Sequence, residues 1–223
     1  FNIAIQPAAI LAIVVLYWRT FWDVAKGLFG LEKGALAFVR NLLVAFFPAV
    51  LLGLAFGDVI ETMLGNAVLV CWTLIIGGFA ILAIERWAHP PAEGPGVAGV
   101  PLRTAVLIGL VQCLAMVPGV SRSGATILGA MAFGVDRKTA AEFSFFLAVP
   151  TLSGATVYQL AKRGSELTSD DFALIGIGSA AGFVVALVVV KLFVTIVTKV
   201  GFGPFAWYRI IIGLAGLAWL SLR

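Results

Sequence analysis

The stretch Val117-Pro118-Gly119-Val120-Ser121-Arg122-Ser123-Gly124-Ala125-Thr126 is the part of this chain that decides its fold. It joins two apolar segments, about 104–117 and 125–135, and each is too short to cross a bilayer at roughly 1.5 Å per helical residue. The proline and the glycines interrupt a regular helix. Because irregular backbone at membrane depth must be enclosed by protein or line a wet cavity, the sequence predicts a re-entrant helical hairpin over about 104–135.

The composition of the whole chain predicts a membrane protein. Hydrophobic residues make up 61% of the 223 positions and charged residues 12%, which is half of the roughly 25% charge typical of a soluble domain. The net charge of +4 lies mostly between the apolar runs, so we expect membrane lipids as partners and no nucleic acid. Cys71 and Cys113 lie inside apolar runs, a pattern that indicates neither a disulfide nor a metal site.

The expected fold is an all-α polytopic membrane protein with about six transmembrane helices in addition to the hairpin. The polar segments 19–33 and 85–103 are predicted to be loops. Asp58 and Glu61 are predicted to form the exit loop of a helix that Pro48 kinks. The six predicted helices cover about 3–18, 36–56, 67–84, 143–160, 172–190 (with a continuation to 197) and 205–220.

The charges between the segments favour a hairpin over a seventh crossing. A hairpin leaves Arg137 and Lys138 on the same side as Arg86 and the basic segment 19–33, which the positive-inside rule places in the cytoplasm. The acidic exit loop and the segment 162–171 are then external. A full crossing would separate Arg137 and Lys138 from Arg86, so the hairpin is the preferred interpretation.

The order of the elements predicts one integral membrane domain, 1–223, built from two repeats of opposite orientation, 1–84 and 104–223. Each repeat has three spans, and the first span of each contains a proline, Pro7 or Pro150. Because the second repeat begins with a hairpin, the first should also have one. We expect that hairpin to lie upstream of Phe1, outside this chain.

The predicted break contains the groups that bind a phosphate. An arginine at membrane depth costs about 3 kcal/mol on insertion scales, which makes Arg122 a functional candidate. Its guanidinium can donate two hydrogen bonds to a phosphate and can stabilise the charge that develops during phosphoryl transfer. Glycines allow a close backbone approach, and hydroxyl groups can cap the next helix or bind the anion. These residues are Gly119, Gly124, Ser121, Ser123 and Thr126. In the alternative interpretation, Arg122 reaches a lipid headgroup and the serines only cap a helix.

Three other polar residues have two interpretations each. Gln112 contacts the phosphate or a water, or forms a helix–helix hydrogen bond. Arg209 is a second phosphate contact or an interfacial anchor. Glu142 pairs with Arg137 or Lys138, or binds a cation. The membrane-depth residues include no histidine and no carboxylate pair, so the chain supplies an anion site without a general acid or base. A divalent cation, Mg²⁺ or Ca²⁺, stays an open expectation for which no residue is assigned as a ligand.

These residues resemble those of the bacterial undecaprenyl-pyrophosphate phosphatase family (UppP/BacA). The family motif Pro-Gly-x-Ser-Arg-Ser-Gly-x-Thr is present as residues 118–126, and the likeness covers essentially all 223 residues. Other segments that match are Gln112-Cys113-Leu114-Ala115, Ala141-Glu142-Phe143-Ser144-Phe145, Ala148-Val149-Pro150, Pro204-Phe205-Ala206-x-Tyr208-Arg209, and Ile5-Gln6 with Ile10-Leu11-Ala12.

The resemblance implies a multi-pass hydrolase of the bacterial inner membrane that converts undecaprenyl pyrophosphate to undecaprenyl phosphate and inorganic phosphate. That reaction recycles the lipid carrier of cell-wall synthesis and gives bacitracin resistance. The resemblance also implies that Arg122 binds the polyprenyl diphosphate, with Ser121, Ser123 and Thr126 assisting, and a homodimer is a further expectation. The family's second motif, Glu-x-x-x-Glu followed by a Ser-Ser/Thr-x-Gly-His run, is absent here and is expected before Phe1, with the nucleophile and the base.

The alternative function is a transporter or flippase of an anionic lipid or solute, because inverted repeats and broken helices are typical of transporters. A structural subunit without a ligand is a third class.

Overall fold

The computed structural model describes residues 6–163 and 169–222, with the side-chain surroundings of all of these except 163 and 169–173. Five of its helices are long and apolar enough to cross a membrane, and there are six crossings if the bent pair α1 and α2 is one span. The predicted all-α polytopic membrane fold is confirmed in this part of the chain. The elements are α1 (Gln6–Leu16), α2 (Trp18–Phe29), α3 (Lys33–Met63), α4 (Ala67–Trp87), η1 (Val97–Gly99), α5 (Leu102–Gln112), η2 (Cys113–Met116), α6 (Arg122–Ala132), α7 (Arg137–Arg163), α8 (Ser169–Lys199) and α9 (Gly203–Ser221).

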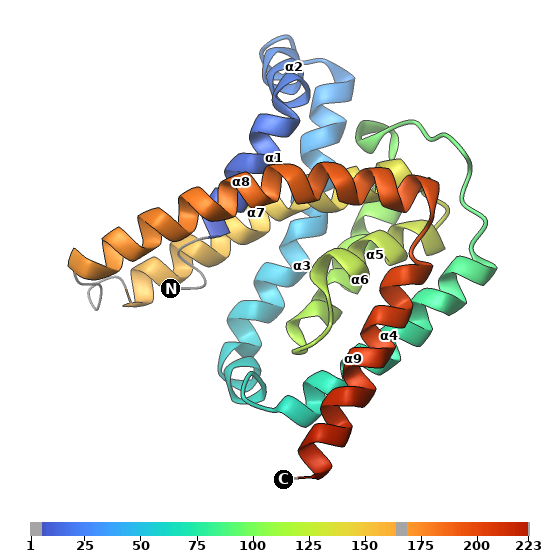
Figure 1. Cartoon of the computed structure of the whole chain (residues 1–223). Helices are drawn as coiled ribbons and strands as arrows, with labels where there is room; N and C mark the ends of the chain where they lie inside the picture. The colour runs from blue at the N-terminus through green and yellow to red at the C-terminus, as the bar shows by residue number, and fades with distance from the viewer. Residues whose placement is uncertain (1–5, 164–168, 223) are drawn as a thin grey trace.

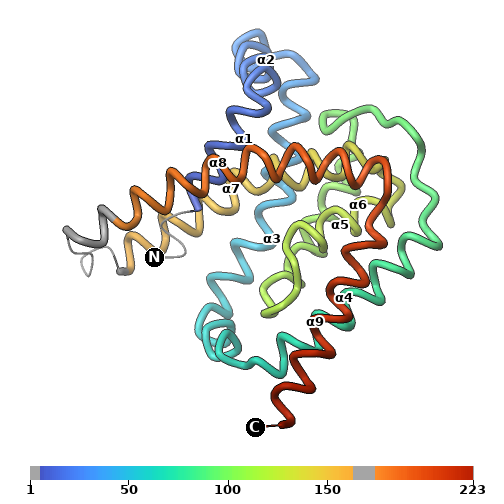
Figure 2. The backbone as a smooth tube through the Cα atoms, in the orientation of Figure 1, coloured from blue at the N-terminus to red at the C-terminus, as the bar shows by residue number. Residues whose placement is uncertain are grey.

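The long helices pack in pairs around a short central hairpin. Figure 1 shows α4 beside α9. A second pair, α7 and α8, crosses α1 and α3. The hairpin formed by α5, η2 and α6 lies between α3 and the α4–α9 pair, as the backbone trace in Figure 2 shows. The short helices are therefore enclosed by the long ones, as irregular backbone in a membrane requires.

Burial follows the same plan. The largest fully buried side chains include Phe143, Phe146 and Leu147 on α7, and Ile108 and Ile127 on the hairpin. The outer faces of the long helices expose large apolar side chains, for example Ile177 on α8 at 71% exposure. Such a surface is unfavourable in water and favourable against lipid tails. The core thus fixes the hairpin against α7, and the outer helices face the bilayer.

Ion pairs support the hairpin over a full crossing. Arg137 Nη1 lies 2.9 Å from Glu85 Oε1, so the end of α4 and the start of α7 meet on one side of the protein. The residues between them therefore leave and return on that side. A second pair, Lys162 Nζ to Glu61 Oε1 at 3.8 Å, joins the far end of α7 to the far end of α3. Both contacts agree with the loop arrangement expected from the charges.

The prediction of a loop over 19–33 was wrong. Most of this segment forms α2, whose axis is bent by 78° from α1. Its charged residues share an amphipathic helix with Trp18 and Trp22, which are exposed and stacked with ring centroids 5.5 Å apart. Phe21 on the same helix packs edge-on against Phe146 at 5.4 Å. The charges mark the polar face of a surface helix, and a polar count alone does not distinguish such a face from a loop.

The boundaries of the second predicted helix also differ. Helix α3 continues to Met63, so Asp58 and Glu61 lie in a helix and not in an exit loop. The non-helical residue inside α3 is Phe56, with φ −120° and ψ 18°, and not the predicted kink residue Pro48.

The segment 85–103 is not purely a surface loop. Helix α4 extends to Trp87, and Val97 and Val100 are buried at 5% and 3% exposure. Asn41, which is fully buried on α3, donates from Nδ2 to the carbonyl oxygens of Val97 at 3.1 Å and Val100 at 2.7 Å. The carbonyl oxygen of Val97 also accepts from the backbone N–H of Val100 at 3.3 Å. Asn41 thus supplies buried backbone acceptors with a side-chain donor and holds the segment against the start of α3.

Helix α7 begins before the predicted position 143. Asp136 caps its first turn, since Asp136 Oδ1 accepts from the backbone N–H of Thr139 at 2.9 Å. Parts of two predictions, residues 3–5 of the first span and 164–168 of the segment 162–171, lie outside the described residues.

Candidate functional site

The break between the two half-helices is confirmed, and its conformation follows from its residues. Gly119 has φ +87°, a left-handed conformation that other residues adopt at a cost. Ser121 is extended, and its Oγ accepts from the backbone N–H of Gly124 at 3.1 Å, which makes Ser121 the N-cap of α6. The first N–H groups of a helix have no carbonyl one turn earlier, so Arg122 stands where free donors and the positive end of the helix dipole coincide.

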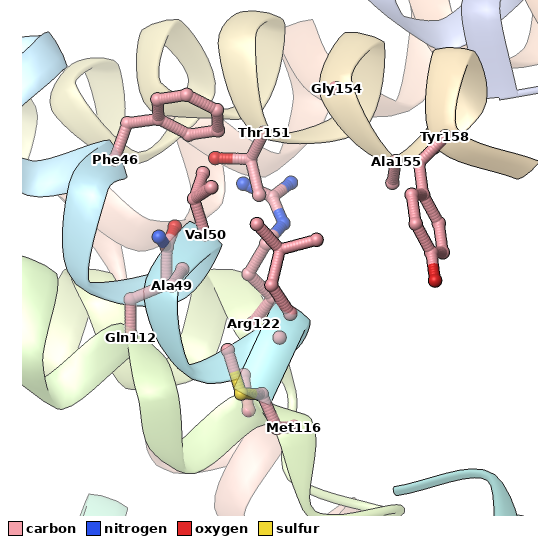
Figure 3. Close-up of a pocket in the computed structure, with 13 residues that line it drawn as sticks. Phe46, Ala49, Val50, Gln112, Met116, Arg122, Thr151, Gly154, Ala155 and Tyr158 are labelled. Atoms are coloured by element: carbon pink, nitrogen blue, oxygen red, sulfur yellow. The ribbon is translucent and has the colours of Figure 1, made fainter. Parts of the chain in front are cut away.

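Arg122 extends into a cavity of about 370 Å³. Figure 3 shows its guanidinium directed toward Thr151 of α7; Gln112 and Met116 of the hairpin line the same cavity. Arg122 Nη1 donates to the carbonyl oxygen of the fully buried Ser144, at 3.4 Å, and no carboxylate pairs with Arg122 among the described residues. The cavity is lined by Phe46, Ala49, Val50, Gly53, Leu54, Gln112, Ala115, Met116, Arg122, Thr151, Gly154, Ala155 and Tyr158.

These contacts argue against the snorkelling interpretation of Arg122. A snorkelling side chain leaves the protein for the headgroups. Arg122 instead binds a carbonyl inside α7 and lies in a cavity between helices, where its positive charge is uncompensated by a described carboxylate. A partly desolvated guanidinium without a counter-ion favours an anionic ligand.

Gln112 is the second polar group of this cavity. It is 2% exposed, and both its Nε2 and its Oε1 are buried without a hydrogen-bond partner among the described residues. The helix–helix hydrogen bond considered for Gln112 is therefore not formed. A buried amide without partners is unfavourable, so the geometry indicates a ligand or a water that uses both atoms.

The serines of the motif lie on the other face of the hairpin. Ser121, Ser123 and Gly124 line a separate cavity of about 640 Å³ with Arg209, between the hairpin and the helices α4, α8 and α9. Ser121 Oγ and Ser123 Oγ are 3.3 Å apart. The sequence placed Arg122 and the serines in one site, whereas the structure places them on opposite faces of the same helix start.

Thr126 points away from both cavities. It is 1% exposed, and its Oγ1 lies 3.0 Å from the carbonyl oxygen of Arg122 and 2.6 Å from Ser144 Oγ. Its hydroxyl group thus binds α6 and α7, which is the role of a packing contact and not of a phosphate ligand.

The side chain of Arg209 binds backbone carbonyl oxygens of the break and of α4. Arg209 Nη2 donates to the carbonyl oxygen of Gly119 at 3.0 Å and to that of Thr73 at 3.2 Å. Thr73 Oγ1 in turn lies 2.7 Å from the carbonyl oxygen of Pro118. Arg209 is therefore bound inside the protein, and the interfacial anchor that the sequence allowed is not its role.

Sequence reasoning missed three residues of the site: Thr73, Ser144 and Thr151. Each is a single hydroxyl in an apolar helix, and no local pattern separates such a residue from one that bonds to its own helix. Only for Ser144 was there a signal, its place in one of the segments that carry the family resemblance.

Of the two ion-pair partners predicted for Glu142, Arg137 pairs instead with Glu85. Lys138 lies near enough to Glu142 to interact electrostatically, but the two form no ion pair within 4.0 Å in the described residues. Within the described ranges, no group of three His, Cys, Asp or Glu side chains is arranged to hold a metal ion.

The fold and the site together define a class: a polytopic helical membrane protein with a broken-helix hairpin that presents an arginine to an amphiphilic cavity. The chain matches the family described as "Bacitracin resistance protein BacA" over residues 1–215, and it belongs to that family. It is 55% identical to the undecaprenyl-diphosphatase of Novosphingobium aromaticivorans and 54% identical to that of Sphingopyxis alaskensis. Each match covers all of this chain and 84% of the relative. The undecaprenyl-diphosphatase of Nitrobacter winogradskyi is 47% identical, over all of this chain and 82% of that protein.

Proposed function

We propose that this protein is an undecaprenyl-diphosphatase, which hydrolyses undecaprenyl pyrophosphate to undecaprenyl phosphate and inorganic phosphate. Its family and its relatives, named undecaprenyl-diphosphatase at 47–55% identity, support this activity. The observation that carries it in the structure is the guanidinium of Arg122, which has no carboxylate partner among the described residues and lies in a mostly apolar cavity between helices. Such a cavity suits a ligand with an anionic head and an apolar tail.

We assign Arg122 to the diphosphate. Hydrolysis forms a bond between a water oxygen and the terminal phosphorus and breaks the bond from that phosphorus to the bridging oxygen, which leaves on the lipid phosphate. Negative charge grows on the bridging oxygen as that bond breaks. A guanidinium that donates two N–H bonds to the developing charge stabilises the transition state more than it stabilises the bound substrate, and this difference accelerates the step.

The other predicted site residues have supporting roles in this proposal. Gln112 offers a donor and an acceptor beside Arg122, one for a phosphate oxygen and one for a water. Ser121 and Ser123 begin the helix whose N–H groups face the anion. Gly119 lets the break pack closely against α4, and Gly124 donates its N–H to the capping Ser121. Thr126 binds Ser144, whose carbonyl oxygen accepts from Arg122, and so helps to position the guanidinium.

The apolar wall of the cavity suits the polyprenyl chain. Phe46, Val50 and Leu54 lie on successive turns of α3, and the lining is completed by residues that include Met116 and Gly154. An isoprenoid chain could pass from the surrounding lipid into this cavity without crossing a polar surface, and its diphosphate would then reach Arg122.

The activity places the protein in a bacterial membrane, where it recycles the carrier lipid of cell-wall synthesis and confers resistance to bacitracin. We propose the inner membrane as its location, because the carrier is used there. The homodimer stays a prediction, for which chemical crosslinking in native membranes is the test.

We also propose the inverted repeat within one domain, 1–84 and 104–223. A two-fold axis that relates α1 to α7, α3 to α8 and α4 to α9 maps each of the pairs α4–α9 and α1–α7 onto itself, and it makes α3–α7 equivalent to α1–α8. All four of these pairs are in contact, which supports the proposal.

The test is phosphate release from a C55 polyprenyl diphosphate by the purified full-length protein in detergent. Arg122→Ala should lower kcat/KM by at least about 10²-fold, the typical effect of losing one charge-stabilising donor. Arg122→Lys should remain poor, because an ammonium lacks the two-pronged geometry. The control Arg40→Ala removes a guanidinium outside both cavities and should retain release. Release that survives Arg122→Ala would refute the site, and transport without release would favour the alternative, a transporter.

A further inference from the structure

We propose that Arg209 and Thr73 are positioning residues that clamp the backbone of the hairpin break, so that its carbonyl oxygens face α4 and α9 while its N–H groups and Arg122 stay available to the anion. This inference rests on the proposed function, and it replaces the phosphate contact that the sequence suggested for Arg209. The juxtaposition that carries it is one cluster in which Arg209, Thr73, Pro118 and Gly119 meet.

The clamp has two arms. The first is Thr73 of α4, whose single hydroxyl proton faces the carbonyl oxygen of Pro118 at 2.7 Å and that of Val70 at 2.9 Å. The second is Arg209 of α9, whose Nη2 bridges the carbonyl oxygens of Gly119 at 3.0 Å and of Thr73 at 3.2 Å. Two long helices, far apart in sequence but packed side by side, thus hold two consecutive carbonyls of the break.

Glycines make room for this cluster. A Cβ on Gly77, one turn after Thr73, would lie 2.5 Å from Arg209 Nη2 and would block its path. Gly119 has φ +87°, and a Cβ there would meet Thr73 and the carbonyl oxygen of Val70. The close approach of α4, α9 and the break is therefore built into the sequence at both glycines.

The clamp matters for an anion site because carbonyl oxygens carry partial negative charge and repel phosphate. In a break, where helical hydrogen bonds are interrupted, each carbonyl needs another donor. Arg209 and Thr73 supply these donors on the side away from Arg122, which lies in the other cavity. Arg209 also adds a positive charge behind the backbone, which favours an anion without touching it.

The kinetic test uses phosphate release by the full-length protein, with Thr73→Val as the main variant because it removes the hydroxyl at nearly constant volume and carries no charge. Losing one hydrogen bond that orders the site should lower kcat by about 3- to 10-fold with a smaller change in KM. Thr73→Ser should restore the wild-type rate. The matched control is Thr195→Val, since among the described residues Thr195 Oγ1 bonds to its own helix alone, at the carbonyl oxygen of Lys191.

A second measurement does not depend on activity. With Cys71 and Cys113 replaced by alanine, Val120→Cys places a thiol in the break. Its labelling rate with a membrane-permeant maleimide should rise several-fold in Thr73→Val and in Arg209→Met, and the double variant should add little to either one. If the parent protein releases no phosphate, the proposed function fails while labelling still tests the clamp. Labelling that is unchanged in both variants, or an Arg209→Lys variant that changes KM alone, would overturn the clamp in favour of a direct phosphate contact.

Discussion

Ser144 Oγ and Thr126 Oγ1 lie 2.6 Å apart and both residues are buried, so one hydrogen bond between two hydroxyl groups joins α7 to α6. The carbonyl oxygen of Ser144 also accepts from Arg122 Nη1 at 3.4 Å. The placement of the guanidinium therefore depends on how α6 packs against α7.

This pair predicts unequal effects of two substitutions. Thr126→Val leaves Ser144 Oγ buried without the partner it has now, and we expect the free energy of unfolding to fall by about 1–3 kcal/mol. Ser144→Ala should cost less, because Thr126 Oγ1 keeps the carbonyl oxygens of Arg122 and Ser123 as acceptors. Reversible unfolding in mixed micelles measures both values. The opposite order would show that Thr126 does not hold Ser144.

Two glycines with similar positive φ allow the cost of backbone strain to be measured apart from the cost of a steric collision. Gly119 and Gly134 both have positive φ, +87° and +83°. A Cβ on Gly134 would meet nothing within 4 Å, whereas one on Gly119 would collide with Thr73 and with the carbonyl oxygen of Val70. Gly134→Ala should cost about 1–2 kcal/mol from backbone strain alone and leave phosphate release intact. Gly119→Ala should cost more and abolish release, as unfolding and activity measurements on both variants will show. Equal losses would mean that the break does not pack against α4 as described.

Replacing the two buried side-chain amides, Gln112 and Asn41, should change thermal stability in opposite directions. Gln112 has no hydrogen-bond partner for its amide among the described residues, whereas Asn41 donates to Val97 and Val100. Gln112→Leu removes an unpaired polar group, so thermal stability should stay the same or rise while phosphate release falls. Asn41→Leu should lower the melting temperature, because the buried carbonyl oxygen of Val100 loses its side-chain donor and that of Val97 keeps only the 3.3 Å bond from Val100 N–H. A Gln112→Leu protein that is less stable than the parent would indicate that the amide is paired inside the fold.

The sequence predicted the break because proline, glycine and hydroxyl residues around one arginine stand out within an apolar chain. It also predicted the long helices, since an apolar run of about 20 residues has the length that a helix needs to span a bilayer. It did not predict which cavity each residue of the motif faces. Ser121 is the extended N-cap and Arg122 the first helical residue, and consecutive helical residues such as Arg122 and Ser123 point about 100° apart, so neighbouring residues of the motif need not face the same cavity. That direction is set by packing against α4 and α7, which the motif does not encode.

The other errors have a similar cause. Helix α2 was expected to be a loop because its charges were counted and their helical spacing was not used. The partners Thr73 and Ser144 lie in helices distant in the chain from the break, and their roles follow only from helix packing.

The hairpin and the loops on either side of it have a defined side of the membrane in this fold. The ion pair between Arg137 and Glu85 requires the hairpin to enter and leave on one side. In a protein without Cys71 and Cys113, cysteines at Glu93 and Lys138 should react with the same membrane-impermeant thiol reagent from the same side, and a cysteine at Gly65 should react from the other. The basic residues near the first two positions predict that they face the cytoplasm. Labelling in intact cells and in inverted vesicles distinguishes the sides, and a cysteine within α8, at Val184, serves as the unreactive control in the lipid. Opposite sides for the cysteines at 93 and 138 would require a seventh crossing, which would separate Arg137 from Glu85 and move Arg122 away from the contacts that hold it.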